Sequence, residues 1–453
     1  MTTTAPAKRV HITTFGCQMN EYDSARLAGM LAELGYESAA DLQEADLILV
    51  NTCSVRERAE HKVYSYLGAL RELKQRRPGL LIGVGGCVAQ QEGKRLLDSV
   101  PYLDLVFGTQ ALERVPELIE EARAGRRVVC TPGEPMPVGL AGAHEADHPQ
   151  LRPGLKAMVT VMTGCDNFCS YCVVPYVRGR ERSRPASEVA REVAQLTAAG
   201  AREVTLLGQN VNSYRDPERG LDFAGLLEML CREPELWRLR FTTSHPKDLS
   251  PALVEAMAGL DKVMEQLHLP AQSGSDRVLA AMKRGYTRRQ YLERVADLRR
   301  RAPGVCLGGD IIVGFPGETE DDFAQSLSLL EEVGYDFLFS FMYSDRPFTK
   351  ASKLPDKHLE AEKSRRLQRL QELQRGISLA RHRALVGSVA EVLVEGPAKR
   401  GQGLMSGRER GGRVVNFEGK AELKGTLARV RVKEGLVNSL KGRLVGPAGG
   451  VEP

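Results

Sequence analysis

The feature that most constrains the fold of this chain is an alternation of short apolar segments with amphipathic helical stretches. Near the N-terminus, three such segments each end in a cysteine: VHITTFGC, ADLILVNTC and LLIGVGGC. The cysteines are Cys17, Cys53 and Cys87, and their separations of 36 and 34 residues are about the length of one βα unit. Residues 8–125 are therefore predicted to form an α/β domain with a parallel sheet. All three cysteines then fall at the carboxyl ends of strands, where sites in such sheets form.

A second run of the same alternation follows a stretch rich in proline and glycine. That stretch, residues 131–154, has no helical or strand period and is predicted to be a linker at a domain boundary. Beyond it, candidate strands alternate with helical stretches: KAMVTVM, EVTLLGQN, LRFTTS, EQLHLP, CLGGDIIVG and FLFSFMYS. This pattern predicts a partial (βα)6 barrel of parallel strands over residues 151–382, with its chemistry at the strand ends.

The C-terminal quarter differs in pattern and in charge. Residues 356–385 have a helical pattern with alternating charge, which is typical of a solvated connecting helix. Short alternating segments separated by glycines then predict a small β-barrel over residues 385–448. Residues 356–453 contain 20 Lys and Arg against 11 Asp and Glu, although the whole chain carries only +5. This positive surplus indicates contact with a polyanion, and nucleic acid is the first candidate. The alternative is that the charges only form a solvated face.

Composition and cysteine usage exclude several classes of protein. The chain has no run of about 18 apolar residues, and its start, MTTTAPAKRV, lacks the apolar region of a signal peptide. We therefore expect a soluble, cytoplasmic protein without membrane contact. Nine cysteines, an odd number in 453 residues, are too sparse for a secreted disulfide scaffold. Thiolate chemistry or metal binding is the better interpretation.

The densest cysteine motif is TGCDNFCSYC, in which Cys165, Cys169 and Cys172 follow the first core strand with the spacing Cys-x3-Cys-x2-Cys. Iron–sulfur clusters with a full set of protein ligands use four cysteines, so three leave one iron open. An open position is what a catalytic metal site needs, and the amino and carboxylate groups of S-adenosylmethionine (SAM) can fill it. The alternatives are a zinc site, although zinc motifs favour Cys-x2-Cys pairs with a fourth ligand, or three ordinary cysteines in a turn.

The N-terminal cysteines support a second cluster less directly. An isolated cysteine at a strand end is commonly a small buried hydrophobe. Three at equivalent positions of successive βα units would converge in space, as cluster ligands must, and would again leave one iron open. The other cysteines, Cys130, Cys231 and Cys306, show no such relation and are expected to serve packing.

With these motifs the chain resembles the radical-SAM methylthiotransferases over nearly its whole length. The segments TFGCQMNEYDS, NTCSVRE and GGCVAQ resemble the family's N-terminal domain. Its radical SAM core is matched by GCDNFCSYCVVPYVRGRERSRP, LLGQNVNSYR, HLPAQSGSDRVLAAMKRGYT and DIIVGFPGET, and the terminal barrel looks like a TRAM domain, an OB-like RNA-binding module. The segments GQNVNSY and TTSHP resemble the branch that acts on isopentenylated adenosine in tRNA. The branches acting on threonylcarbamoyl-adenosine in tRNA, or on a ribosomal protein aspartate, are the alternative.

The resemblance implies an enzyme that replaces the C2 hydrogen of N6-(dimethylallyl)adenosine at tRNA position 37 with a methylthio group. It implies two [4Fe-4S] clusters, with the sulfur coming from the N-terminal one, and two SAM molecules, one as methyl donor and one as radical source. An unactivated aromatic C–H bond has no useful acidity, so the radical chemistry comes from the cofactor and no catalytic residue beyond the cluster ligands is expected. The implied partners are the anticodon stem-loop of tRNA and an electron donor such as flavodoxin or ferredoxin, with the enzyme a monomer. A protein that holds Fe–S or zinc and only binds RNA is the non-enzyme alternative.

The same resemblance suggests contacts with SAM. Gln209 stands after the second core strand, where relatives use a short motif toward the SAM amino group. Ser273 follows the fourth strand, and Arg284 is a candidate partner of the SAM carboxylate. Gly314 resembles a backbone position that approaches adenine closely, as glycine allows. For each, a satisfied loop residue is the plain alternative.

Two further features bear on the substrate. The side chains of Arg178, Arg180, Arg182 and Arg184 follow the cluster loop and are expected to meet either RNA phosphates or acidic neighbours. In SDRPFTKAS, where relatives commonly have Pro-Gly-Thr, Phe348 replaces the glycine, and Phe disfavours backbone angles that glycine permits, which puts the shape of this loop in question. The terminal barrel contains one aromatic residue, Phe417, so charge contacts rather than base stacking are expected to hold RNA there.

Overall fold

The computed structural model describes residues 8–54, 57–133 and 154–447. The chain forms two compact units, which are described separately: Met1–Ala201 with Leu206–Gln209 and Arg346–Ser352, and Arg202–Thr205 with Asn210–Asp345 and Lys353–Pro453. Most of the expected linker, residues 134–153, lies outside the described residues. Among the described residues, no helix combines the length and the apolar character needed to cross a membrane.

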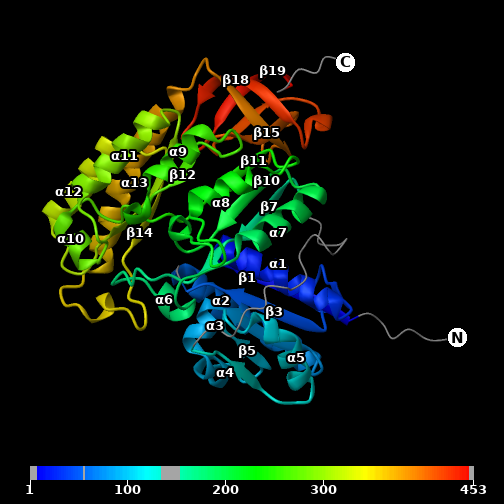
Figure 1. Ribbon diagram of the computed structural model, residues 1–453. Helices are drawn as coiled ribbons and strands as arrows, with labels where there is room; N and C mark the ends of the chain where they lie inside the picture. Colours follow the sequence, from blue (N-terminus) through cyan, green and yellow to red (C-terminus); the bar gives the residue numbers. More distant parts are fainter. Residues whose placement is uncertain (1–7, 55–56, 134–153, 448–453) are drawn as a thin grey trace. The chain divides into compact units, whose positions relative to one another are not determined.

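A six-stranded parallel sheet forms the N-terminal part of the first unit, as predicted (Figure 1). Its strands lie in the order β2-β1-β3-β4-β5-β6. They are β1 (Lys8–Phe15), β2 (Tyr36–Ser38), β3 (Leu47–Thr52), β4 (Leu81–Gly86), β5 (Leu105–Phe107) and β6 (Val128–Cys130). Every residue of β3 and β4 is buried, which is why LILVNT and LIGVGG lack the polar alternation of a half-exposed strand.

Helices cover both faces of this sheet. They are α1 (Gln18–Glu33), α2 (Glu57–Arg76), α3 (Cys87–Glu92), α4 (Lys94–Ser99) and α5 (Val115–Arg123). One core joins α1 and α5 to the sheet through side chains such as Leu27 and Leu118, and a second core joins α2 and α4 to it through Leu70 and Leu96. Apolar packing on both faces is what a parallel sheet requires. The predicted α/β class is therefore confirmed, and the sheet continues to Cys130.

The rest of the first unit carries the beginning of the expected core. It contains β7 (Lys156–Thr160), the antiparallel pair β8 (Met162–Thr163) and β9 (Arg182–Ser183), and the helices α6 (Val174–Val177) and α7 (Ala186–Ala198). The strand β10 (Glu203–Leu207) is divided between the units. Its end belongs to the first unit, where the amide of Val161 donates to the carbonyl of Leu207.

Repeated strand–helix pairs make up the first part of the second unit. The strands are β11 (Arg238–Phe241), β12 (Gln266–His268), β13 (Cys306–Val313) and β14 (Phe337–Met342), with helices α8 (Phe223–Leu230), α9 (Pro251–Gly259), α10 (Asp276–Ala281), α11 (Arg288–Arg301) and α12 (Glu320–Val333). The last three strands form a parallel sheet in the order β12-β13-β14, and a parallel bridge joins Leu239 to Val263 just before it. Strands therefore neighbour one another in sequence order, as the predicted βα repeats require.

Helix α13 (Glu360–Arg383) is not the solvated connector that its charges predicted. A stripe along it is buried, at the side chains of Lys363, Arg366, Leu370, Gln374, Ser378 and His382. These positions recur every three or four residues, which places them on one face of the helix. The prediction was wrong because this face is polar: Gln374 donates to the carbonyl of Tyr335, and Arg366 lies 2.7 Å from a carboxylate oxygen of Glu318.

The C-terminal strands close into the predicted small barrel. They are β15 (Val389–Pro397), β16 (Leu404–Glu409), β17 (Val414–Glu418), β18 (Leu427–Gly435) and β19 (Leu440–Pro447), in the order β15-β16-β17-β19-β18. The ring of Phe417, 1% exposed, lies in the barrel core with Val392 and Val430. The single aromatic of this barrel is therefore unavailable for stacking on RNA. Arg238 of β11 supports the barrel by donating to the carbonyls of Arg408 and Glu391.

Candidate functional site

The three N-terminal cysteines lie at one edge of the parallel sheet. Strands β1, β3 and β4 are neighbours, and their ends are in register, with Phe15 beside Thr52 and Thr52 beside Gly86. Cys17 caps the N-terminus of α1, Cys53 directly follows β3, and Cys87 begins α3. The carboxyl ends of three adjacent parallel strands thus bring the cysteines to the same edge, where the sequence predicted them.

Two buried asparagines hold the loop that carries Cys17. The side-chain amide of Asn20 donates to the side-chain oxygen of Asn51 and to the carbonyl of Thr52, each at 3.0 Å. Asn51 donates in return to the carbonyl of Asn20 at 2.9 Å, and the Cys17 thiol donates to Oδ1 of Asn20 at 3.4 Å. Sequence reasoning missed these residues. The signal was present, because Asn51 is a polar residue inside the fully buried strand LILVNT.

A buried guanidinium faces this cysteine edge. Nη2 of Arg178 lies 2.9 Å from Oδ2 of Asp23, and each of the two side chains is 7% exposed. A hydrogen bond with Cys53 lowers the pKa of the Cys17 thiol to about 6, against the effect of burial, and Arg178 lowers it further. Burial raises the pKa of Cys87, which Arg178 partly offsets. Thiolates are the form that binds iron, so a positive charge at this edge suits a cysteine metal site.

The second triad lies on the loop between β8 and α6, and local backbone contacts shape that loop. The amide of Cys165 donates to the carbonyl of Gly179 at 3.2 Å, and the amide of Cys172 donates to the carbonyl of Cys169 at 3.0 Å. Gly164, just before the triad, has a φ of +79°, and a Cβ there would lie 2.0 Å from the carbonyl oxygen of Arg180. Glycine is therefore required at this turn.

The two triads belong to the same unit, and their surroundings touch. Cys87 packs against Val173 and Val177, and Val173 directly follows Cys172 of the second triad. The hydroxyl of Thr109, beyond β5, also donates to the carbonyl of Val177. Residues that are far apart in the sequence thus place one triad beside the other, which no spacing in the sequence revealed.

The thiols of the two triads fit iron–sulfur clusters better than a single metal ion. Among the described residues, no three Cys, His, Asp or Glu side chains converge as the ligands of a single metal ion would. The ligands of a four-iron cluster bind separate irons, so they do not need to converge on one point. Three thiols per site, a charge-stabilised Cys17 and a tightly turned loop at Gly164 fit a cluster held by three cysteines. The cysteines outside the triads lie at a strand end (Cys130), a helix C-terminus (Cys231) and a strand start (Cys306).

Of the four candidate contacts with SAM, Gln209 lies with the second triad. Its side-chain oxygen accepts a hydrogen bond from the amide of Gly164 at 2.5 Å. Its Nε2 is buried and has no hydrogen-bond partner among the described residues. An unpaired buried donor beside a candidate cofactor site is the kind of group that a ligand satisfies.

The other three candidates belong to the second unit and make contacts within it. The hydroxyl of Ser273 accepts from the amide of Ser275 at 3.2 Å. Arg284 donates to the carbonyl of Pro270 at 2.9 Å and to the hydroxyl of Tyr286 at 3.0 Å. Gly314 has a φ of +71°, and a Cβ there would lie 2.4 Å from the Lys363 side chain. This close neighbour alone requires glycine at position 314, and the contact with SAM stays a prediction.

The arginines after the cluster loop mostly meet acidic neighbours. Besides the pair of Arg178 with Asp23, Nη1 of Arg184 lies 2.6 Å from a carboxylate oxygen of Glu192, and both side chains are buried. Arg180 pairs with Asp166 at 3.0 Å but stays exposed, and Arg182 is also exposed. Arg178, Arg180 and Arg184 therefore have acidic neighbours, and contact of the exposed Arg180 with RNA stays a prediction.

The substitution at Phe348 has a visible consequence. Its φ is +67°, in the left-handed region that favours glycine, and its side chain is 60% exposed. Phe348 therefore keeps a glycine-like backbone, and the replacement of glycine costs backbone strain at this residue. Its segment belongs to the unit that holds both triads, and the amide of Ala351 donates to the carbonyl of Ser170 in the cluster loop at 2.8 Å.

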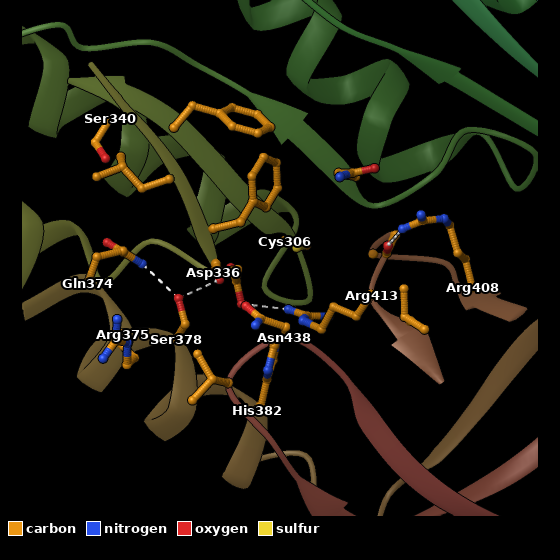
Figure 2. A pocket seen from close by; sticks show the side chains of 18 of the residues that line it. Cys306, Asp336, Ser340, Gln374, Arg375, Ser378, His382, Arg408, Arg413 and Asn438 are labelled. Carbon is orange, nitrogen blue, oxygen red and sulfur yellow. Dashed lines mark hydrogen bonds and ion pairs between the residues drawn. The ribbon is translucent and has the colours of Figure 1, made fainter. Parts of the chain in front are cut away.

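A cavity of about 520 Å³ lies in the second unit, among β13, β14, α13 and the terminal barrel (Figure 2). Asp336 on its wall lies 2.6 Å from Nη2 of Arg413, and Ser378 donates to the backbone carbonyl of Asp336 at 3.0 Å. Burial would raise the pKa of Asp336, but Arg413 and Arg381 lower it. None of the six triad cysteines lines this cavity, so it is not part of the candidate active site.

Comparison with known proteins gives one consistent picture. Family models match residues 9–108 (an uncharacterized protein family, UPF0004), 159–330 (the radical SAM superfamily) and 383–445 (the TRAM domain). Proteins named tRNA-2-methylthio-N(6)-dimethylallyladenosine synthase match nearly end to end. The one from Geobacter metallireducens is 54% identical over 96% of this chain and 98% of its own length. The one from Syntrophobacter fumaroxidans is 50% identical over 98% of both chains.

Solved structures support the fold alone. The radical S-adenosylmethionine methyltransferase TsrM from Kitasatospora setae superposes with a TM-score of 0.57 and 16% identity, over 76% of this chain and 75% of that one. The radical enzyme OxsB superposes with a TM-score of 0.52 and 12% identity, over 82% of this chain and 56% of that one. These matches support the fold of parallel strands and helices that the βα repeats predicted.

Proposed function

The chain belongs to the family of tRNA-2-methylthio-N(6)-dimethylallyladenosine synthases, and from this premise we propose that it inserts a methylthio group into tRNA. Its substrate is N6-(dimethylallyl)adenosine at position 37, and the new group replaces the hydrogen on C2 of the base. Relatives that are 46–54% identical to this chain carry this name, which favours this substrate over threonylcarbamoyl-adenosine and over a ribosomal protein aspartate.

The observation that carries this proposal is the proximity of the two cysteine triads. Cys87 packs directly against Val173, the residue after Cys172. A sulfur insertion needs a radical-generating centre and a sulfur source at one substrate atom, and proximity is what makes such a reaction effectively unimolecular. A chain with only Cys165, Cys169 and Cys172 would generate a radical and leave the sulfur without an origin.

Each triad is assigned one cofactor. Cys165, Cys169 and Cys172 would hold a [4Fe-4S] cluster that binds SAM, and Cys17, Cys53 and Cys87 would hold a second [4Fe-4S] cluster. When bound, these clusters and two molecules of SAM supply the radical, the methyl group and the sulfur. The chain supplies the positions: Asn20 and Asn51 fix the Cys17 loop, and Arg178 offsets the negative charge of the thiolates.

Gln209 is the residue we assign to SAM in the first unit. Because its oxygen already accepts from Gly164, the group left for a ligand is the Nε2 donor. A donor suits the carboxylate of SAM and does not suit its ammonium group, which has no acceptor to offer. This assignment changes the expected partner of Gln209 from the amino group of SAM to its carboxylate.

The RNA and protein partners follow from the same proposal. The terminal barrel keeps its aromatic ring inside, so its exposed Lys and Arg side chains, such as Arg429, Arg431 and Lys433, hold the anticodon stem-loop by charge. The electron that the reaction requires comes from a flavodoxin or a ferredoxin, and the enzyme works as a monomer in the cytoplasm, where tRNA is modified.

The test is turnover by the anaerobically reconstituted protein with tRNA that carries N6-(dimethylallyl)adenosine. Wild type is expected to give 5′-deoxyadenosine and the 2-methylthio nucleoside, both measured by mass spectrometry. Cys17→Ala should keep deoxyadenosine formation and lose methylthiolation, whereas Cys165→Ala should lose both. Cys231→Ala, a half-buried cysteine outside both triads, is the matched control and should retain both products.

Two results would overturn the proposal. Wild type that forms deoxyadenosine but modifies only tRNA carrying threonylcarbamoyl-adenosine, or only a ribosomal protein, would reassign the substrate. Wild type that binds tRNA but forms no deoxyadenosine with a strong reductant would make the chain an RNA-binding protein.

A further inference from the structure

An exposed aromatic patch adjoins the loop of the radical triad. It consists of Phe168, which lies between Cys165 and Cys169, with Tyr176 at the end of α6 and Phe348. The ring centroids of Phe168 and Tyr176 are 6.2 Å apart, and those of Tyr176 and Phe348 are 6.1 Å apart. Tyr176 is 40% exposed and Phe348 is 60% exposed. Phe168 is half-buried, and its ring meets that of Tyr176 edge to face. Contiguous aromatic side chains that face solvent are typical of binding surfaces.

Two members of this patch are held in unfavourable backbone conformations. The φ of Phe168 is +45° and that of Phe348 is +67°, a region in which a bulky residue is an outlier. The segment of Phe348 is fixed on both sides. Thr349, 1% exposed, donates through its hydroxyl to the carbonyl of Arg346 at 2.8 Å, and Ala351 donates to Ser170. Such backbone strain persists only where contacts with neighbouring residues hold the conformation in place. Strained residues of this kind are common at ligand-binding sites.

A positive charge lies against the same patch. The guanidinium carbon of Arg180 stands 5.2 Å from the ring centroid of Phe168. Its ion pair with Asp166 is exposed, with 69% of the Arg180 side chain in solvent. Because exposed ion pairs contribute little stability, the guanidinium can exchange Asp166 for a phosphate at small cost. Aromatic faces with an adjacent arginine form the usual surface for an unpaired nucleotide.

We propose that the patch of Phe168, Tyr176 and Phe348 receives an unpaired nucleobase of the tRNA substrate by stacking, with Arg180 on the adjoining phosphate. The inference rests on the proposed function, which brings an anticodon loop to the cluster loop that carries Phe168. The patch also supplies the exposed aromatic rings that the terminal barrel lacks, because Phe417 is buried in the barrel core. The patch thus orients the loop, while the barrel holds the tRNA by charge.

The test uses the reconstituted holoenzyme and an anticodon stem-loop with 2-aminopurine placed in turn at each loop position. Stacking on an aromatic ring quenches 2-aminopurine fluorescence, so the measurement reports the contact itself. The variants are Phe348→Gly, which removes the ring and suits the backbone, and Phe348→Tyr, which keeps a ring. Phe168 is left unchanged because it lies among the cluster ligands. The control is Leu34→Ala, an exposed apolar residue (51%) at the opposite end of α1 from Cys17.

In wild type, one loop position is expected to be quenched on binding. Phe348→Gly should abolish this quench and weaken stem-loop binding about 5- to 150-fold, the usual effect of removing one stacked ring. Its melting temperature should not fall, since glycine relieves the strained backbone, and its iron content should match wild type. Phe348→Tyr and Leu34→Ala should keep both the quench and the affinity.

Three outcomes would overturn the inference: no quenched position in wild type, unchanged affinity in Phe348→Gly, or a defect in Phe348→Gly confined to reduction by flavodoxin, which would make the patch a protein-docking surface. The proposed function is judged separately, because it fails only when wild type forms no 2-methylthio product. Product formation by wild type with unaltered binding by Phe348→Gly would reject the patch and leave the function standing.

Discussion

Replacing Arg178 by methionine tests the buried ion pair that faces the N-terminal cysteines. Nη2 of Arg178 and Oδ2 of Asp23 are 2.9 Å apart, and both side chains are 7% exposed although 155 residues separate them in sequence. Methionine is of similar length and apolar, so it fills much of the space. Asp23 is then left as a buried carboxylate without its partner.

The expected loss follows from that unpaired charge. Removing one partner of a buried ion pair costs about 3–5 kcal/mol, whereas replacing both with apolar residues is often neutral. Arg178→Met should therefore lower the free energy of unfolding by about that amount. The double variant Asp23→Leu/Arg178→Met should lie within about 1–2 kcal/mol of wild type.

The assay is urea unfolding of the anaerobically reconstituted proteins, followed by circular dichroism at 25 °C, with iron content measured in parallel. Arg289→Met is the control, because its ion pair with Glu293 is exposed and is worth about 0–1 kcal/mol. Iron content separates two roles of Arg178. The double variant regains stability but still lacks the positive charge beside Cys17 and Cys87, so it should hold less iron than wild type.

The reasoning would be refuted by a loss below about 1 kcal/mol in Arg178→Met, since Asp23 would then have water or another partner. It would equally be refuted by a double variant no more stable than the single one. Full iron content in the double variant would show that the charge of Arg178 does not support the cysteine site.

Three further predictions concern the radical triad and the RNA. In Gly164→Ala the new Cβ would meet the carbonyl oxygen of Arg180, so the protein should lose the cluster of the radical triad, about four of its eight irons, and all formation of deoxyadenosine. A variant that retains all its iron would contradict this prediction. Gln209→Ala should weaken SAM binding about 10- to 150-fold at unchanged iron content, measured by equilibrium dialysis, and an unaltered Kd would dismiss the contact. Affinity for tRNA should fall steeply with salt, by about 10³-fold or more between 50 and 200 mM; a flat log–log plot of filter-binding data would rule out a charge-based contact.

Local sequence pattern was sufficient for the elements and for the edge where the chemistry lies. The period of VHITTFGC, ADLILVNTC and LLIGVGGC predicted adjacent parallel strands, and Cys17, Cys53 and Cys87 do lie together at their ends. Glycines between short alternating segments likewise predicted the terminal barrel. Where local pattern failed, as on α13, the buried face was polar, and polarity in a sequence normally indicates solvent.

What the sequence determined by itself was therefore the class of fold and the two sets of three thiols, because hydrophobic period and ligand spacing are local properties. Tertiary structure decided which residues of the chain contact one another. It paired Arg178 with Asp23, set Cys87 against Val173, placed the Lys363 side chain against Gly314, and brought Phe348 to Tyr176. These contacts join residues whose separation in the chain carries no signal of proximity. Only the packing of one element against another creates them, and with them the arrangement on which the proposed sulfur insertion depends.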